Sequence, residues 1–86
     1  MALFLVWHEE EAAIDPETLF ALDSFELRSG LLLVASDLSV SRLYHQIKWA
    51  LPRKTALLVT CIEGTPKFKL MEEGALSWTR SRATRN

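Results

Sequence analysis

The chain of 86 residues has few of the residues that stabilise small domains through disulfide bonds or bound metal ions: it contains one cysteine, Cys61, and two histidines. One cysteine cannot form an internal disulfide, and three scattered glycines cannot form a Gly-rich phosphate loop. Apolar runs such as Leu31–Ala35 and Ala56–Val59 are far shorter than the ~20 residues of a membrane-spanning helix. These absences leave one small globular domain, in which 49% hydrophobic residues supply a core.

The N-terminus lacks the positive charge that a secretory signal carries. The apolar stretch Met1–Trp7 contains no Lys or Arg and continues directly into His8 and three glutamates. Together with the single cysteine, this pattern predicts a cytoplasmic protein without a signal peptide.

Basic residues are absent from the first third of the chain. Residues 1–27 hold seven acidic side chains, whereas residues 28–86 hold ten basic and four acidic ones, for a net charge of −1. Such asymmetry marks some nucleic-acid or partner surfaces. We favour the simpler explanation that both halves fold together and neutralise each other, because a compact domain mixes its surface charges.

Local signals predict the first half of the fold. Residues 2–7 are apolar and too short for a helix between their flanks, so they predict a buried strand. Asp15 and Pro16 indicate the start of a short helix over residues 16–23. Residues 25–27 and 31–35 then predict two strands of a hairpin, with one long strand bulged at Gly30 as the alternative.

The second half begins with the best-defined helix, over residues 38–51, which has apolar residues at helical spacing and ends at Pro52. A β-branched strand is expected over residues 55–62. Residues 67–79 fit either a short helix or a last strand, and we leave both open. Residues 80–86 carry three arginines and no large apolar side chain, which predicts a basic, flexible tail.

The order strand, helix, strand, strand, helix, strand predicts an α+β protein of ferredoxin-like βαββαβ type. Its antiparallel sheet would carry the helices on one face, with a single domain over residues 1–79 and a C-terminal extension. The other sheet face then needs a partner, a further segment or polar side chains. For that reason we expect a homodimer.

The hairpin, helix, Pro-terminated loop and strand of Phe25–Ile62, with the strand over residues 2–7, resemble the small CRISPR adaptation proteins. The resemblance is one of pattern and covers about two-thirds of the chain. In that family an aspartate at the end of the first strand binds metal at a dimer axis, and His8 and Glu9 take the matching positions here. The resemblance therefore implies, as one hypothesis, a divergent metal-dependent nuclease.

Arg42, His45 and Trp49 fall on one face of the helix over residues 38–51, opposite its apolar stripe. Arg and Trp are common anchors of protein interfaces, and they also bind phosphates and stack on bases. The alternative is a solvated face on which Trp49 folds back over the core edge. These three residues are the candidate interface.

A second group of candidates lies near the C-terminus, where basic residues alternate with aromatic ones. The group suggests nucleic-acid binding, although the sequence pI of about 6.1 is not basic. Its members are Lys67, Lys69, Arg80 and Arg82.

No catalytic or metal-binding set emerges. Adjacent residues of a strand point to opposite faces, so at most two of His8 and Glu9–Glu11 can converge, whereas zinc needs about four ligands. Cys61 lies within an apolar strand and predicts a small buried thiol. We therefore expect no cofactor, no catalytic residue and no membrane partner. The first hypothesis is a non-enzymatic interaction module acting as a homodimer; nucleic-acid binding and the nuclease are its alternatives.

Overall fold

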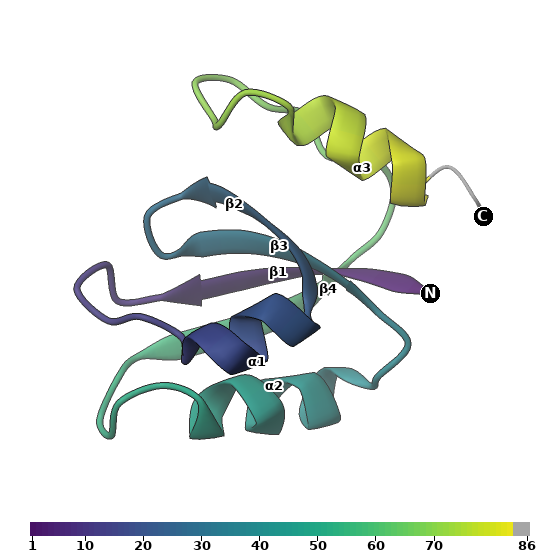
Figure 1. Cartoon of the computed structure of the whole chain (residues 1–86). Helices are drawn as coiled ribbons and strands as arrows, with labels where there is room; N and C mark the ends of the chain where they lie inside the picture. The colour runs from purple at the N-terminus through teal and green to yellow at the C-terminus, as the bar shows by residue number, and fades with distance from the viewer. Residues whose placement is uncertain (84–86) are drawn as a thin grey trace.

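The computed structural model describes residues 1–83, which form a four-stranded sheet with helices on both faces (Figure 1). No helix in this part of the chain is long and apolar enough to cross a membrane. The elements are β1 (Ala2–His8), α1 (Pro16–Ala21), β2 (Asp23–Arg28), β3 (Leu31–Ser36), α2 (Val40–Trp49), β4 (Leu57–Ile62) and α3 (Ala75–Ala83).

The sheet has the strand order β2-β3-β1-β4, and all three pairings are antiparallel. The apolar strand β1 therefore lies inside the sheet between β3 and β4, while β2 and β4 form its edges. The α+β class and the antiparallel sheet confirm the sequence-based prediction.

The hairpin between β2 and β3 depends on Gly30. Its φ of +80° lies in the left-handed region, which suits glycine. A Cβ added there would lie 2.5 Å from the backbone oxygen of His8, and the amide of His8 donates to the carbonyl of Gly30 across 2.9 Å. The chain thus forms two strands and a tight turn rather than one bulged strand, and the irregularity in pairing lies between Glu26 and Arg28.

Both predicted helices form, and each begins at a capping side chain. The side chain of Asp15 accepts a hydrogen bond from the amide of Thr18 (3.2 Å), directly before Pro16. Ser39 caps α2 in the same way by accepting from the amide of Arg42 (3.2 Å).

The face of the sheet under α1 and α2 holds the larger hydrophobic core. Leu43 and Ile47 of α2 have no exposed surface, and they pack against side chains from alternate positions of the central strands. The cluster comprises Phe4, Val6, Ile14, Leu32, Val34, Leu43, Ile47 and Leu51.

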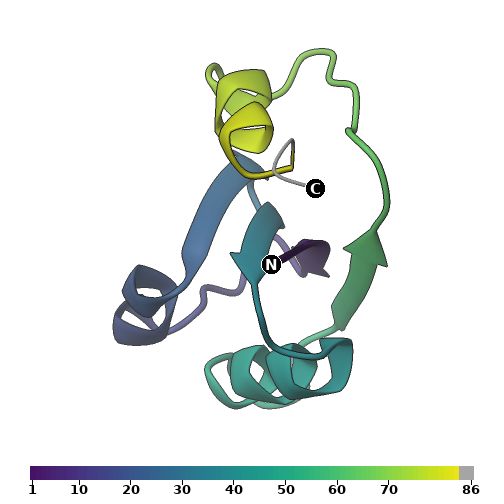
Figure 2. The same ribbon diagram turned by 90° about the vertical axis from the view of Figure 1, so that its right-hand side faces the viewer.

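The opposite face is covered by α3, a helix that the sequence left undecided (Figure 2). Its buried Ala75 joins a second cluster, against which Phe68, Met71 and Trp78 also pack. The buried members from the strands are Leu3, Leu27, Leu33 and Ala35. This face was expected to need a partner, a further segment or polar side chains, and the chain covers it with a further segment of its own. The expectation that helices lie on one face only was therefore wrong.

The helix α3 continues to Ala83, past the boundary expected at residue 80. Arg82, placed in a tail by the sequence analysis, bonds to Asp23 of β2. Because its partner lies far away in the sequence, local composition could not predict that Arg82 belongs to the folded domain. Residues 84–86 of the predicted tail lie outside the described residues.

Substituting Gly30 tests the hairpin. We expect Gly30→Ala to lower the free energy of unfolding by about 2–4 kcal/mol, from the left-handed backbone and the close His8 carbonyl together. Gly64→Ala is the matched control, because Gly64 has a similar φ of +76° but no atom within 4 Å of its added Cβ. Urea titration of both variants measures the difference, and equal losses would contradict the role given to the His8 contact.

Candidate functional site

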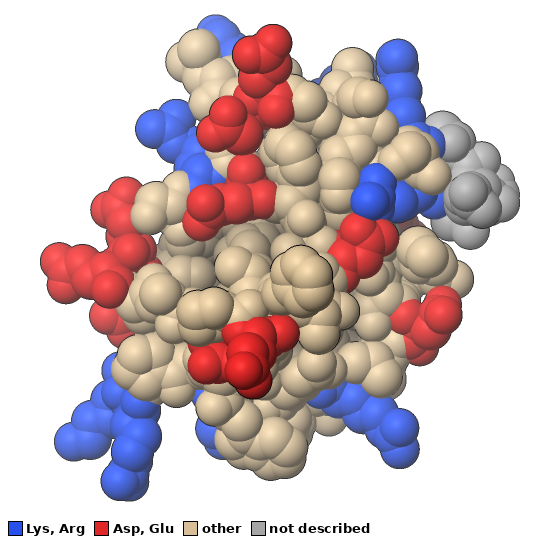
Figure 3. All heavy atoms as spheres, viewed as in Figure 1, with Lys and Arg blue, Asp and Glu red and all other residues tan. Residues whose placement is uncertain are grey.

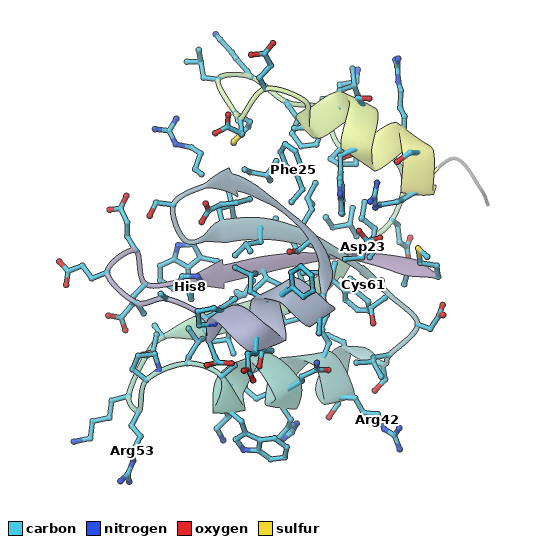
Figure 4. All side chains as sticks on the ribbon, in the orientation of Figure 1. His8, Asp23, Phe25, Arg42, Arg53 and Cys61 are labelled. Carbon is cyan, nitrogen blue, oxygen red and sulfur yellow. The ribbon has the colours of Figure 1, made fainter. Side chains whose placement is uncertain are left out.

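The outer face of α2 carries the three residues that the sequence selected. Arg42, His45 and Trp49 are all exposed, and Figure 4 shows Arg42 pointing away from the molecule. The Nδ1 of His45 donates to the backbone oxygen of Ser41 across 2.8 Å. Its ring lies 5.7 Å from that of Trp49. The structure therefore brings His45 and Trp49 into contact, with Arg42 one turn away.

Trp49 does not fold back over the core, since 77% of its surface is exposed. It borders a groove shared with the start of α1, which includes Ile14 and Pro16. A second groove, on the side toward β4, includes Trp49, Arg53 and Lys54. A large aromatic side chain between two grooves resembles the anchor positions of protein interfaces.

The C-terminal basic residues do not form one surface. Arg82 is turned inward, where its guanidinium makes two 2.8 Å bonds to the carboxylate of Asp23. It also lies 4.0 Å above the ring of Trp78, which in turn packs 5.9 Å from Phe25. Arg82 thus fastens α3 to β2 instead of facing a ligand.

The remaining candidates of this group are exposed. Lys67 and Arg80 border one groove together with Phe68 and Leu76, whereas Lys69 lies outside it. On the face shown in Figure 3, acidic and basic side chains are interspersed rather than separated. The predicted nucleic-acid surface is therefore reduced to a short basic segment.

His8 and Glu9 have structural contacts. His8 is only 4% exposed, and its Nδ1 donates to the carbonyl of Glu9 across 2.8 Å. A carboxylate oxygen of Glu9 accepts from the amide of Ala56 at 2.6 Å, which joins the end of β1 to the start of β4. Within residues 1–83, no group of three His, Cys, Asp or Glu side chains is placed to hold a metal ion.

Cys61 is exposed, and the prediction of a buried thiol was wrong. Its strand lies at the sheet edge, where one side is left open. Cys61 pairs with Phe4 and His8 with Leu57, so four residues of strand, roughly 13 Å, separate thiol and imidazole. They cannot act as a nucleophile and base.

An apolar pair on the sheet surface is not among the candidates predicted from the sequence. Trp7 and Leu58 lie directly opposite each other in neighbouring strands, and they are 43% and 51% exposed. Trp7 sits in an apolar stretch that predicted a buried strand, and Leu58 in the strand expected over residues 55–62. Neither side chain belongs to the cluster that packs under α3, which is why both stay accessible.

A double-mutant cycle tests the contact that holds α3. We expect Asp23→Ala and Arg82→Ala to show a coupling free energy of about 0.5–1 kcal/mol, because the pair has good two-pronged geometry but is partly exposed. The coupling should shrink as salt is raised. Urea titrations of the parent, both single variants and the double variant measure it, and strictly additive effects would rule the contact out.

The chain was also compared with known proteins. No protein family model, no curated protein and no solved structure matches it.

Proposed function

We propose that residues 1–62 form a ferredoxin-like βαββαβ unit to which α3 is added. The elements follow one another in that order, β1, α1, β2, β3, α2 and β4. β3 and β1 lie in the middle of the sheet, and both helices of the unit pack on the same face. β1 and β2 run in the same direction, since each is antiparallel to β3.

We propose that the protein is a non-enzymatic interaction module that acts as a homodimer. The observation that carries the proposal is the exposed pair Trp7 and Leu58, which lies near the outer edge of β4 on the sheet face that α3 covers only in part. Paired apolar side chains at an open sheet edge are typical of surfaces that meet another protein.

The outer face of α2 is the second surface of the proposed module. Trp49 and Arg42 are residue types that often anchor protein interfaces, and the contact with His45 limits the freedom of the indole. In a homodimer this face is displayed twice, so a protein partner with two matching sites gains from binding both.

Two alternatives retain less support. Nucleic-acid binding through the C-terminal segment loses Arg82, which is occupied by Asp23. A metal-dependent nuclease would need Glu9, whose carboxylate already accepts a backbone hydrogen bond.

Light scattering tests the homodimer. We expect a mass of twice 9.8 kDa at micromolar concentration, with little change between about 0.1 M and about 1 M salt, because an apolar interface is not screened. The double variant Trp7→Ser/Leu58→Ser should shift the equilibrium toward the single chain. A 9.8 kDa species throughout this range would contradict the proposal.

A gel-shift and cleavage assay tests the alternatives. We expect the parent protein neither to shift nor to cleave DNA or RNA at low salt with Mg²⁺. A shift that weakens steeply as salt rises would instead favour nucleic-acid binding. Metal-dependent cleavage that disappears in Glu9→Ala would favour the nuclease.

A further inference from the structure

The two edges of the sheet differ in chemistry. β2, at one edge, carries Asp23, Glu26 and Arg28, and charged side chains of this kind discourage further strands from pairing. β4, at the other edge, has the sequence Leu-Leu-Val-Thr-Cys-Ile, without charge, proline or glycine. Within residues 1–83 it pairs only with β1. The outer edge of β4 therefore carries no residue that would prevent another strand from pairing with it.

The backbone groups that face this open edge follow from the sheet's hydrogen bonds. The amide of Glu9 donates to the carbonyl of Ala56 (3.3 Å), and bonded positions alternate along an antiparallel pair. Leu58, Thr60 and Ile62 therefore direct their N–H and C=O groups toward β1. The same groups of Leu57, Val59 and Cys61 point away from the sheet.

We propose that the partner on this edge is a second copy of the chain, whose β4 pairs antiparallel with the first about a two-fold axis. This inference rests on the homodimer proposed above and adds the interface and its register. Val59 lies opposite the partner's Val59, and Leu57 lies opposite the partner's Cys61. In this register all three outward-facing residues of each β4 are bonded, and the two sheets join into one continuous sheet.

The charges beside β4 favour a second copy in the antiparallel direction. Arg53 and Lys54 precede the strand, and Glu63 follows it. The two-fold axis brings Glu63 opposite the partner's Thr55, next to the partner's Lys54. A parallel second copy would instead place like charges side by side, which is unfavourable.

The exposed apolar pair also finds a partner in this register. Leu58 comes to lie opposite the partner's Thr60, which is itself paired with Leu5. Trp7, Leu58, the partner's Thr60 and the partner's Leu5 then form one row across the joined sheet. The partner's Thr60 thus lies directly beside Leu58, whereas Trp7, one strand further in, keeps Leu31 and Leu58 as its cross-strand neighbours.

Two cysteine variants test the register by cross-linking. Leu58→Cys/Cys61→Ser and Thr60→Cys/Cys61→Ser each present one thiol on an exposed position. Oxidised alone, neither variant should form a disulfide dimer, because each introduced thiol faces a different residue of its partner. An equal mixture of the two variants should form a disulfide dimer, since the thiol at position 58 of one variant then faces the thiol at position 60 of the other. These positions form a non-hydrogen-bonded pair, in which the side chains lie close together.

A lysine at the edge tests the same surface without oxidation. We expect Thr60→Lys to weaken dimerisation at least tenfold, measured by dilution in light scattering, because a charged side chain replaces a residue of the interface. Glu26→Lys, on the β2 edge, is the matched control and should leave the dimer unchanged. Circular dichroism confirms that both variants are folded.

The outcomes separate the two proposals. A dimer that survives Thr60→Lys, or that cross-links in a single variant instead of the mixture, overturns the β4 interface or its register and leaves the homodimer in place. A 9.8 kDa species overturns both, and capture of an unrelated β-strand peptide by that species would assign the edge to another protein.

Discussion

The strands of this small sheet are apolar on both faces, and both faces must therefore be shielded from water. Phe4 and Val6 of β1 face the core under α1 and α2, while Leu3 and Leu5 of the same strand face the other side. One layer of helices cannot meet this demand. The chain meets it with α3, whose buried Ala75 packs close to the sheet. Burial on both sides explains why α3 packs on the sheet instead of forming part of a tail.

Features that depend on residues close together in the sequence were predicted, whereas features that depend on distant residues were not. The hairpin and α2 were predicted because their signals are local: a glycine at a turn, and apolar residues at helical spacing that end at Pro52. α3 carries almost no amphipathic pattern, so its place was undecided. Its contact with Asp23 spans 59 positions of sequence, a separation at which no local pattern indicates a partner.

The candidate sites show the same division. The exposed face with Arg42, His45 and Trp49 was predicted from helical spacing alone. Cys61 was expected to be buried because it lies in an apolar strand, yet a strand's position in a sheet depends on the pairing of distant segments. Arg82 was predicted to be a ligand-binding cation for the same reason, since its carboxylate partner lies in β2. For Cys61 and Arg82, the neighbours that decide their environment are distant in the sequence.

The central position of β1 has a consequence for how the protein resists aggregation. Ala2–His8 is an uncharged, strongly β-forming segment up to its last residue, and segments of this kind form amyloid-like stacks when exposed. Here it is bonded to a strand on either side, so its backbone becomes fully exposed only when both β3 and β4 detach. Its amide hydrogens should therefore be among the slowest in the chain to exchange with solvent.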